Sequence, residues 1–215
     1  MMKIPTRVRE LSLSGLATII LMSAASAALP SYPSWGAENS EAYTFTATGT
    51  GPVTGYFAGA TAGYGSMVGL SINGGPVTLW GLQNNSTALG TPFMMGLVTT
   101  GDVMRFVLSV SMNSSFGPAD PASPDYFLSS DPALNPSGSQ HIYSTAYAGG
   151  DYGIPAGTFI GFEDIIPLAS SDKDYDDHQF VFTGPGLNQV PEGGSAIVLL
   201  GLALSGLGMV RRSLS

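Results

Sequence analysis

The fold is decided by a stretch near the middle of the chain, residues 102–111, which reads DVMRFVLSVS. Successive side chains of a β-strand point to opposite faces of its sheet. Met104, Phe106, Leu108 and Val110 would therefore lie on one apolar face, and the residues between them on the other. This alternation predicts a strand with one buried face.

Shorter runs of the same kind precede and follow this strand, with turn-forming residues between them. The sequence NGGP at 73–76 predicts a hairpin, because Asn and Gly tolerate positive φ. The other runs are 42–48, 53–57, 66–72, 77–82, 140–147, 158–162 and 179–183, with 126–128 as a short edge strand. No convincing helical period interrupts them. Eight to ten short strands predict an all-β fold, an antiparallel β-sandwich of jelly-roll type.

The composition excludes several classes of protein. The chain has 215 residues, of which only 10% are charged, and its net charge is −8. Globular domains usually carry about 25% charged residues. The absence of Cys excludes a disulfide framework, a thiolate metal site and a Cys nucleophile. The acidic balance argues against nucleic acid as a partner.

The N-terminus has the pattern of a secretory signal peptide. Three basic residues precede an apolar stretch at 11–22, which is too short to span a bilayer as a helix. Ala25 and Ala27 supply the small side chains that signal peptidase requires. A signal peptide over 1–27 is predicted, with cleavage after Ala27. Residues 28–41 would be a flexible mature N-terminus.

The C-terminus carries a second signal, predicted over 187–215 after a sandwich domain that ends at residue 186. A polar stretch, VPEGGS at 190–195, leads into an uncharged apolar run at 196–210. Fifteen residues reach about 22 Å as a helix, short for a bilayer span but workable when the membrane thins. Arg211 and Arg212 follow and predict a cytoplasmic C-terminus. The alternative is a buried core helix.

These three parts, in this order, resemble the PEP-CTERM class of bacterial sorting signals, in its VPEGG-type form. The resemblance implies a partner, an exosortase, which is a membrane-embedded cysteine protease. It also implies bacteria that export extracellular polysaccharide. The run 196–210 would be the membrane anchor, and Arg211 and Arg212 would be the stop signal. The implied sorting motif is Val190, Pro191, Glu192, Gly193 and Gly194.

An acidic cluster near the end of the domain is the strongest candidate for a binding site. Six carboxylates lie between 163 and 177, and Asp172, Asp174 and Asp176 alternate along the chain as in calcium loops. Crowded carboxylates repel one another unless a cation is present. One interpretation is a calcium site, and the other is a solvated turn with no cofactor. The predicted calcium ligands are Glu163, Asp164, Asp172, Asp174 and Asp176.

The same region resembles a second family, an uncharacterised β-domain of secreted bacterial proteins. The matching residues are GFED at 161–164 and DKDYDD at 172–177, followed by an apolar strand. Asp176 stands where that family usually has Asn. The resemblance implies an extracellular all-β module and no established activity.

Together these features predict an exported protein that is the substrate of an exosortase and is not itself an enzyme. It would be anchored in the membrane through its C-terminal helix before processing. It would then lie at the cell surface or outside the cell, associated with the extracellular polysaccharide matrix. One alternative is a calcium-supported carbohydrate-binding or adhesion module, and another is a glycan-active enzyme with two acids across a cleft.

Overall fold

The computed structural model describes residues 28–112 and 121–185, and the backbone of residues 187–191. Several predicted features lie outside these residues. They are the signal peptide at 1–27, the motif residues Glu192, Gly193 and Gly194, the apolar run at 196–210, and Arg211 and Arg212.

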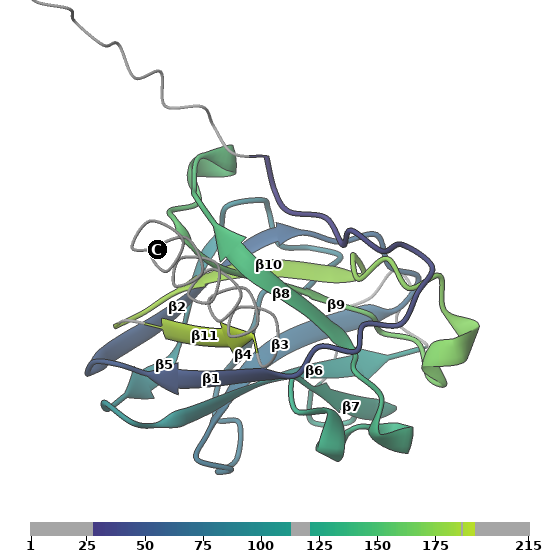
Figure 1. Cartoon of the computed structure of the whole chain (residues 1–215), viewed down its shortest axis with the longest axis horizontal. Coiled ribbons are helices and arrows are strands. Elements are labelled where there is room, and N and C mark those ends of the chain that lie inside the picture. The colour runs from purple at the N-terminus through teal and green to yellow at the C-terminus, as the bar shows by residue number, and fades with distance from the viewer. Residues whose placement is uncertain (1–27, 113–120, 186, 192–215) are drawn as a thin grey trace, which may run out of the picture.

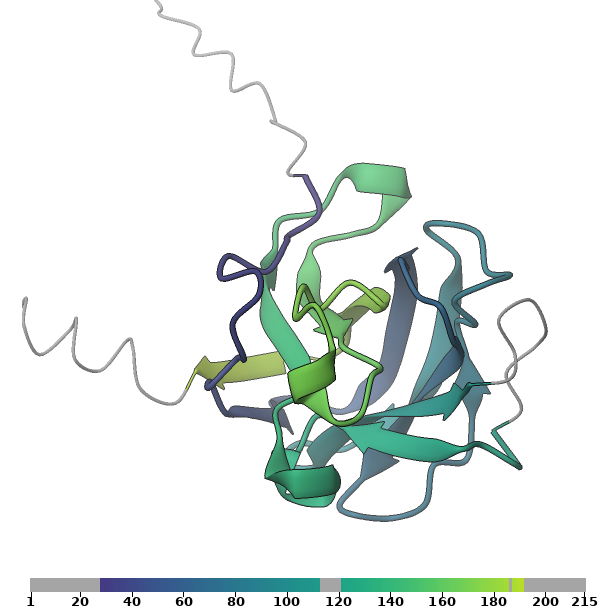
Figure 2. The same ribbon diagram turned by 90° about the vertical axis from the view of Figure 1, so that its right-hand side faces the viewer.

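The described chain forms two antiparallel sheets that pack face to face, so the predicted β-sandwich is confirmed (Figures 1 and 2). The first sheet has the spatial order β11 (Leu187–Pro191), β1 (Tyr43–Ala47), β6 (Val103–Ser111), β3 (Gly65–Ile72) and β4 (Trp80–Gly81), and β7 (Tyr126–Ser129) also pairs with β6. The second sheet has the order β5 (Pro92–Val98), β2 (Gly51–Gly59), β10 (His178–Thr183), β9 (Gly157–Phe162) and β8 (Ile142–Tyr147). Single 3-10 turns occur at Pro132–Leu134, Pro136–Gly138, Asp151–Gly153 and Leu168–Ser170.

The core lies between the two sheets and is rich in phenylalanine. Met104, Phe106, Leu108 and Val110 of β6 are all buried, which confirms the predicted alternation. Across the interface, the ring of Phe106 stacks on that of Phe182 in β10, with centroids 3.8 Å apart. Because aromatic side chains bury large apolar areas, these contacts join the sheets into one core.

Two differences from the sequence-based prediction concern edge strands. Of the predicted run 77–82, only Trp80 and Gly81 pair as a strand, with β3. The strand β5 was not among the predicted runs. Both its exposed and its buried positions carry apolar side chains, so no alternation of apolar and polar residues marks it. Met94 and Leu97 are exposed, whereas Met95 and Val98 are buried. An edge strand of this kind lacks the signal that identified β6.

The first sheet continues into the segment that was assigned to the sorting signal. β11 pairs with β1 over five positions, with Thr44 opposite Val190 and Tyr43 opposite Pro191. The sequence-based boundary at 186/187 therefore lies before the last strand of the sandwich. Pro191 occupies the final position of an edge strand, where its missing N–H costs little.

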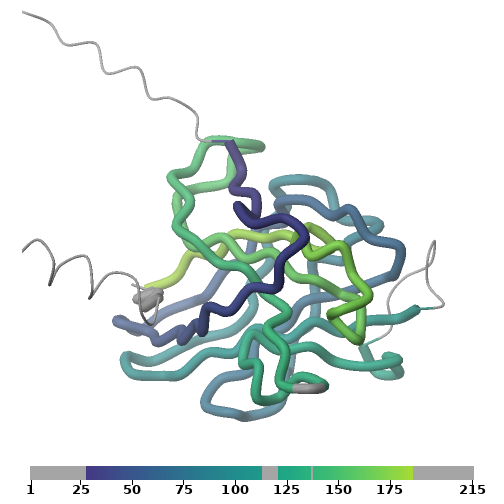
Figure 3. Tube along the Cα trace, turned by 45° about the vertical axis from the view of Figure 1, so that its right-hand side comes forward, coloured from purple at the N-terminus to yellow at the C-terminus, as the bar shows by residue number. Residues whose placement is uncertain are grey.

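The segment 28–41 runs across the surface beside the acidic loop, residues 163–177, which joins β9 to β10 (Figure 3). Asn39 is buried, and its side-chain amide donates to the Tyr43 hydroxyl and the Ile142 carbonyl. The Tyr32 ring contacts Tyr175 edge-on, with centroids 4.6 Å apart. The sequence predicts this segment to be flexible, whereas the structure anchors it through these buried contacts.

Candidate functional site

The pairing of β9 with β10 brings the two halves of the acidic cluster together. His178 at the start of β10 lies opposite Phe162 at the end of β9. Glu163 directly follows Phe162, and Asp177 directly precedes His178. Because antiparallel register continues past the last pair, carboxylates far apart in sequence meet at one end of the hairpin.

Three of the carboxylates converge within a short distance. Glu163, Asp172 and Asp174 each place one oxygen so that all three oxygens lie within 4.8 Å of one another. The chain around Asp174 is sharply turned, because Lys173 and Tyr175 have φ values of 56° and 58°. Such positive φ values are uncommon for residues other than Gly and often occur at functional sites.

Glu163 is the innermost of the three. Its side chain is fully buried, and its Oε1 atom has no hydrogen-bond partner. Burial, together with the nearby Asp177 carboxyl, raises the pKa of Glu163 to about 8. Burial also raises the pKa of Asp164 and of Asp177 to about 7. These carboxyl groups are thus held where the charged form is costly.

Asp164 and Asp176, the other two predicted ligands, lie outside this group of three. The Asp164 N–H donates to Asp177 Oδ2 at 2.8 Å, and the Asp164 carbonyl accepts from the Tyr126 hydroxyl. The Asp176 N–H donates to Asp174 Oδ1 at 3.1 Å. Asp177, which was not among the predicted ligands, also lies outside the group of three, and its Oδ2 atom accepts the Asp164 N–H.

The two histidines are buried next to this region. His141 Nδ1 forms a hydrogen bond with the Glu163 carbonyl at 2.9 Å, and burial lowers its pKa. His178 Nδ1 forms a hydrogen bond with Ser66 Oγ at 2.8 Å, and burial lowers its pKa to about 3. Both rings are therefore neutral at pH 7, and the Nδ1 atom of each is hydrogen-bonded to another residue of the domain.

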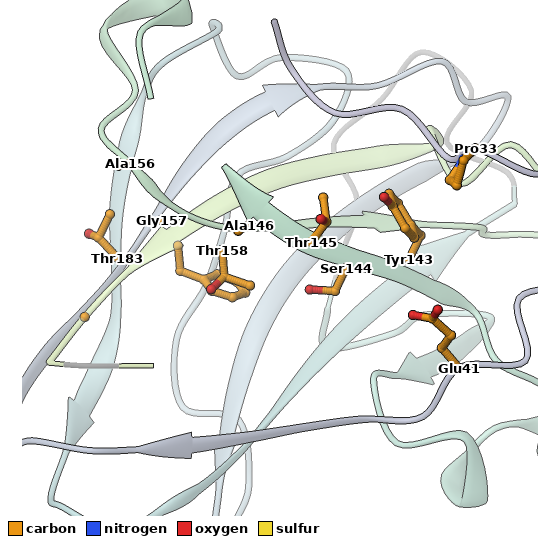
Figure 4. Close-up of a pocket in the computed structure, with 12 residues that line it drawn as sticks. Pro33, Glu41, Tyr143, Ser144, Thr145, Ala146, Ala156, Gly157, Thr158 and Thr183 are labelled. Atoms are coloured by element: carbon orange, nitrogen blue, oxygen red, sulfur yellow. The ribbon is translucent and has the colours of Figure 1, made fainter. Parts of the chain in front are cut away.

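A groove of about 750 Å³ lies beside the edge strand β8 (Figure 4). Its lining includes the Tyr143 ring, the Glu41 carboxylate and three threonine hydroxyls, those of Thr145, Thr158 and Thr183. These side chains, drawn in Figure 4, come from β8, β9, β10 and the segment before β1. A groove with hydroxyls, the Tyr143 ring and the Glu41 carboxylate suits a polar ligand that also has apolar faces.

The other aromatic side chains that could contact a sugar ring occupy varied positions. Trp80 stacks on Phe127, with ring centroids 5.6 Å apart. Trp35 is 73% exposed and lies with Asp174 and Asp176 around a small hollow. Tyr147 is buried. These residues do not form a single row.

Comparison with known proteins finds a similarity at the C-terminal end of the chain. No curated protein and no solved structure matches the chain. Residues 189–214 match the family model described as VPDSG-CTERM motif. Among the described residues there is no helix long and apolar enough to cross a membrane. The match covers the C-terminal segment alone, and leaves the VPEGG subtype and the resemblance to the uncharacterised β-domain as predictions. The chain ends in a PEP-CTERM-like sorting signal, which fits an exported protein whose signal is processed by an exosortase.

Proposed function

We propose that the β-sandwich is delivered to the cell surface by exosortase processing and there associates with the extracellular polysaccharide matrix. The observation that carries the proposal is the sorting-signal match at 189–214. The signal overlaps the last strand, β11, so the folded domain and the processed segment are contiguous. In this proposal the protein is the substrate of the protease and is not an enzyme.

Each part of the signal has a separate role in the proposal. Val190 to Gly194 form the motif that the protease reads. The uncharged run 196–210 is long enough to hold the chain in a thinned bilayer, and Arg211 and Arg212 keep the end of the chain in the cytoplasm. Cleavage would release the sandwich from this anchor.

Expression of the full chain in bacteria with and without an exosortase tests this role. Mass spectrometry of the mature extracellular protein should find a C-terminus upstream of Ala196, and only in cells with the protease. Glu192→Ala should cause the unprocessed chain to accumulate in the membrane fraction. Glu38→Ala, at an exposed position of the domain, should be processed normally. An intact Ser215 on extracellular protein would remove the processing step.

The groove beside β8 favours carbohydrate binding as the activity of the domain. Its hydroxyls and the Glu41 carboxylate can exchange hydrogen bonds with sugar hydroxyls, and Tyr143 offers an aromatic face for a sugar ring. Residues 28–190 contain thirteen acidic and two basic residues, which makes a neutral polysaccharide a better ligand than an anionic one.

A steric block tests this binding role. Ala146 is exposed and lines the groove, so Ala146→Trp should fill it. Binding of the full chain to a panel of immobilised neutral bacterial polysaccharides should fall at least tenfold. Ala88→Trp places the same side chain at an exposed position that does not line the groove, and it should leave binding unchanged. Equal binding by both variants would exclude the groove as the binding site.

A further inference from the structure

The acidic cluster raises an electrostatic problem that the described residues do not solve by themselves. The Arg105–Asp131 pair, at 3.0 Å, is the one ion pair between side chains of the described residues. None of the carboxylates of Glu163, Asp172 and Asp174 belongs to it, although their oxygens gather within 4.8 Å. Like charges at such a separation repel one another strongly where water is partly excluded.

A second observation concerns the interior of the cluster. Glu163 has 0% of its surface exposed, and its Oε1 has no hydrogen-bond partner. Its other oxygen, Oε2, accepts a long hydrogen bond of 3.5 Å from the Tyr175 N–H. Buried polar groups in proteins nearly always have a partner, because leaving one unpaired is costly. A cation bound beside Oε1 would supply that partner.

We propose that Glu163, Asp172 and Asp174 bind one Ca²⁺ ion, with water completing its coordination. The spacing fits, because two oxygens on opposite sides of a Ca²⁺ ion, each about 2.4 Å from it, are about 4.8 Å apart. Asp172 is exposed, so water can reach the ion from that side. Glu163 closes the site from the interior.

The donor set distinguishes calcium from other metals. All three ligands are carboxylates, which hard cations prefer, and the chain has no Cys. Neither of the two nearby histidines belongs to the converging group; their Nδ1 atoms form hydrogen bonds with the Glu163 carbonyl and with Ser66. Two of the carboxylates come from a turned loop, which suits the flexible coordination of Ca²⁺ better than the strict octahedron of Mg²⁺.

The ion would connect two parts of the chain that pack on the domain. Tyr175 follows Asp174, and its hydroxyl accepts from the Asn39 N–H and donates to the Gln140 carbonyl. An ion that fixes Asp174 to Glu163 therefore also fixes the anchor of the segment 28–41. Calcium should raise the stability of the domain and, at the same time, the protection of the backbone amides of this segment from hydrogen exchange.

The test uses the full chain, purified in detergent and treated with a chelator. Calorimetric titration with CaCl2 should give one site, and Tm should rise with calcium concentration. Tb³⁺ should bind in the same place and show luminescence sensitised by Tyr175 and Tyr32, and calcium should displace it. Glu163→Gln and Asp172→Asn should each weaken binding at least tenfold, whereas Glu38→Gln should bind as the unchanged chain does.

The variants also separate loss of the site from loss of the fold. Asp172 is exposed, so Asp172→Asn keeps the core intact and gives a valid result even where Glu163→Gln unfolds. No heat and no rise in Tm at millimolar calcium would mean that protonation alone, without a bound cation, relieves the repulsion between the carboxyl groups. That result, or equal binding by Asp172→Asn and the unchanged chain, would overturn the proposal. Neither outcome depends on processing or polysaccharide binding.

Discussion

The backbone N–H of Asn39 donates to the Tyr175 hydroxyl at 2.8 Å, across 136 positions of sequence. Both residues are buried, and the same hydroxyl donates to the Gln140 carbonyl at 3.2 Å. One side chain of the acidic loop thus satisfies backbone groups of two other segments. The segment 28–41 and the loop before β10 are consequently parts of one structural unit.

Removal of this hydroxyl should destabilise the domain measurably. Tyr175→Phe keeps the ring but leaves the buried Asn39 N–H without its acceptor, which costs about 1–3 kcal/mol. Urea unfolding followed by fluorescence measures the change. Tyr152→Phe is the matched control, because that ring is 60% exposed, and it should alter stability by less than about 0.5 kcal/mol. Equal stability of the two variants would show that the hydrogen bond contributes nothing.

Gly161 of β9 should tolerate no side chain, because the acidic loop packs against its Cα. A Cβ atom there would lie 2.0 Å from the Tyr175 carbonyl oxygen, a backbone atom. Gly161→Ala should therefore cost about 1–3 kcal/mol through displacement of the loop. Gly63→Ala, where a Cβ meets nothing within 4 Å, serves as the control. A Tm of Gly161→Ala equal to that of the control would contradict this packing.

The sequence predicted the elements with strong local patterns and missed those set by tertiary pairing. The alternation in β6 was sufficient to place its buried face. β5 and β11 are edge strands, and their pairing depends on partners that local periodicity does not reveal. The segment 28–41 has no periodic pattern, so its anchoring through Asn39 and Tyr175 could not be read from it.

The candidate site shows the same limit. Residue type and the spacing of Asp172 and Asp174 predicted an oxygen-rich site, and the structure brings both to Glu163. The spacing could not show that Asp164 lies outside the group of converging oxygens. The pairing of β9 with β10 instead places the Asp164 N–H against the Asp177 carboxyl, to which it donates a hydrogen bond. Which carboxylate faces the interior depends on that register and not on the local sequence.

His178 should make a contribution to stability that is lost on acidification. Burial lowers the pKa of this ring to about 3 in the folded state, whereas an unfolded His titrates near 6.5. Between pH 7 and pH 5 the unfolded chain therefore gains a proton at His178 that the folded chain does not, so the contribution of His178 to stability falls as pH falls. The raised pKa values of Glu163, Asp164 and Asp177 contribute with the opposite sign over the same range, so the effect of His178 has to be measured by comparison with a variant. The loss attributable to His178 should be about 1–2 kcal/mol.

The variant His178→Asn isolates this effect, because Asn can keep a hydrogen bond to Ser66 but does not titrate. Urea unfolding of both chains at pH 7 and pH 5 gives four free energies of unfolding. The difference between the chains should shrink or reverse at pH 5. An unchanged difference would mean that His178 titrates alike in the folded and unfolded states.

The pairing of β11 with β1 predicts which positions of the sorting segment accept proline. Backbone groups of Ala47 bond to Gly101 and Asp102, on the side of β6, so by alternation those of Thr44 and Thr46 face β11. Thr46 lies opposite Asn188, whose N–H is therefore directed toward β1.

Asn188→Pro should remove that hydrogen bond and accelerate hydrogen exchange at the Thr44 and Thr46 amides at least tenfold. Gln189→Pro should have little effect, because the Gln189 N–H points away from β1 at the sheet edge. Fast exchange at Thr46 in the unchanged chain would show that residues 187–191 do not pair with β1, and that the sandwich ends before the sorting signal.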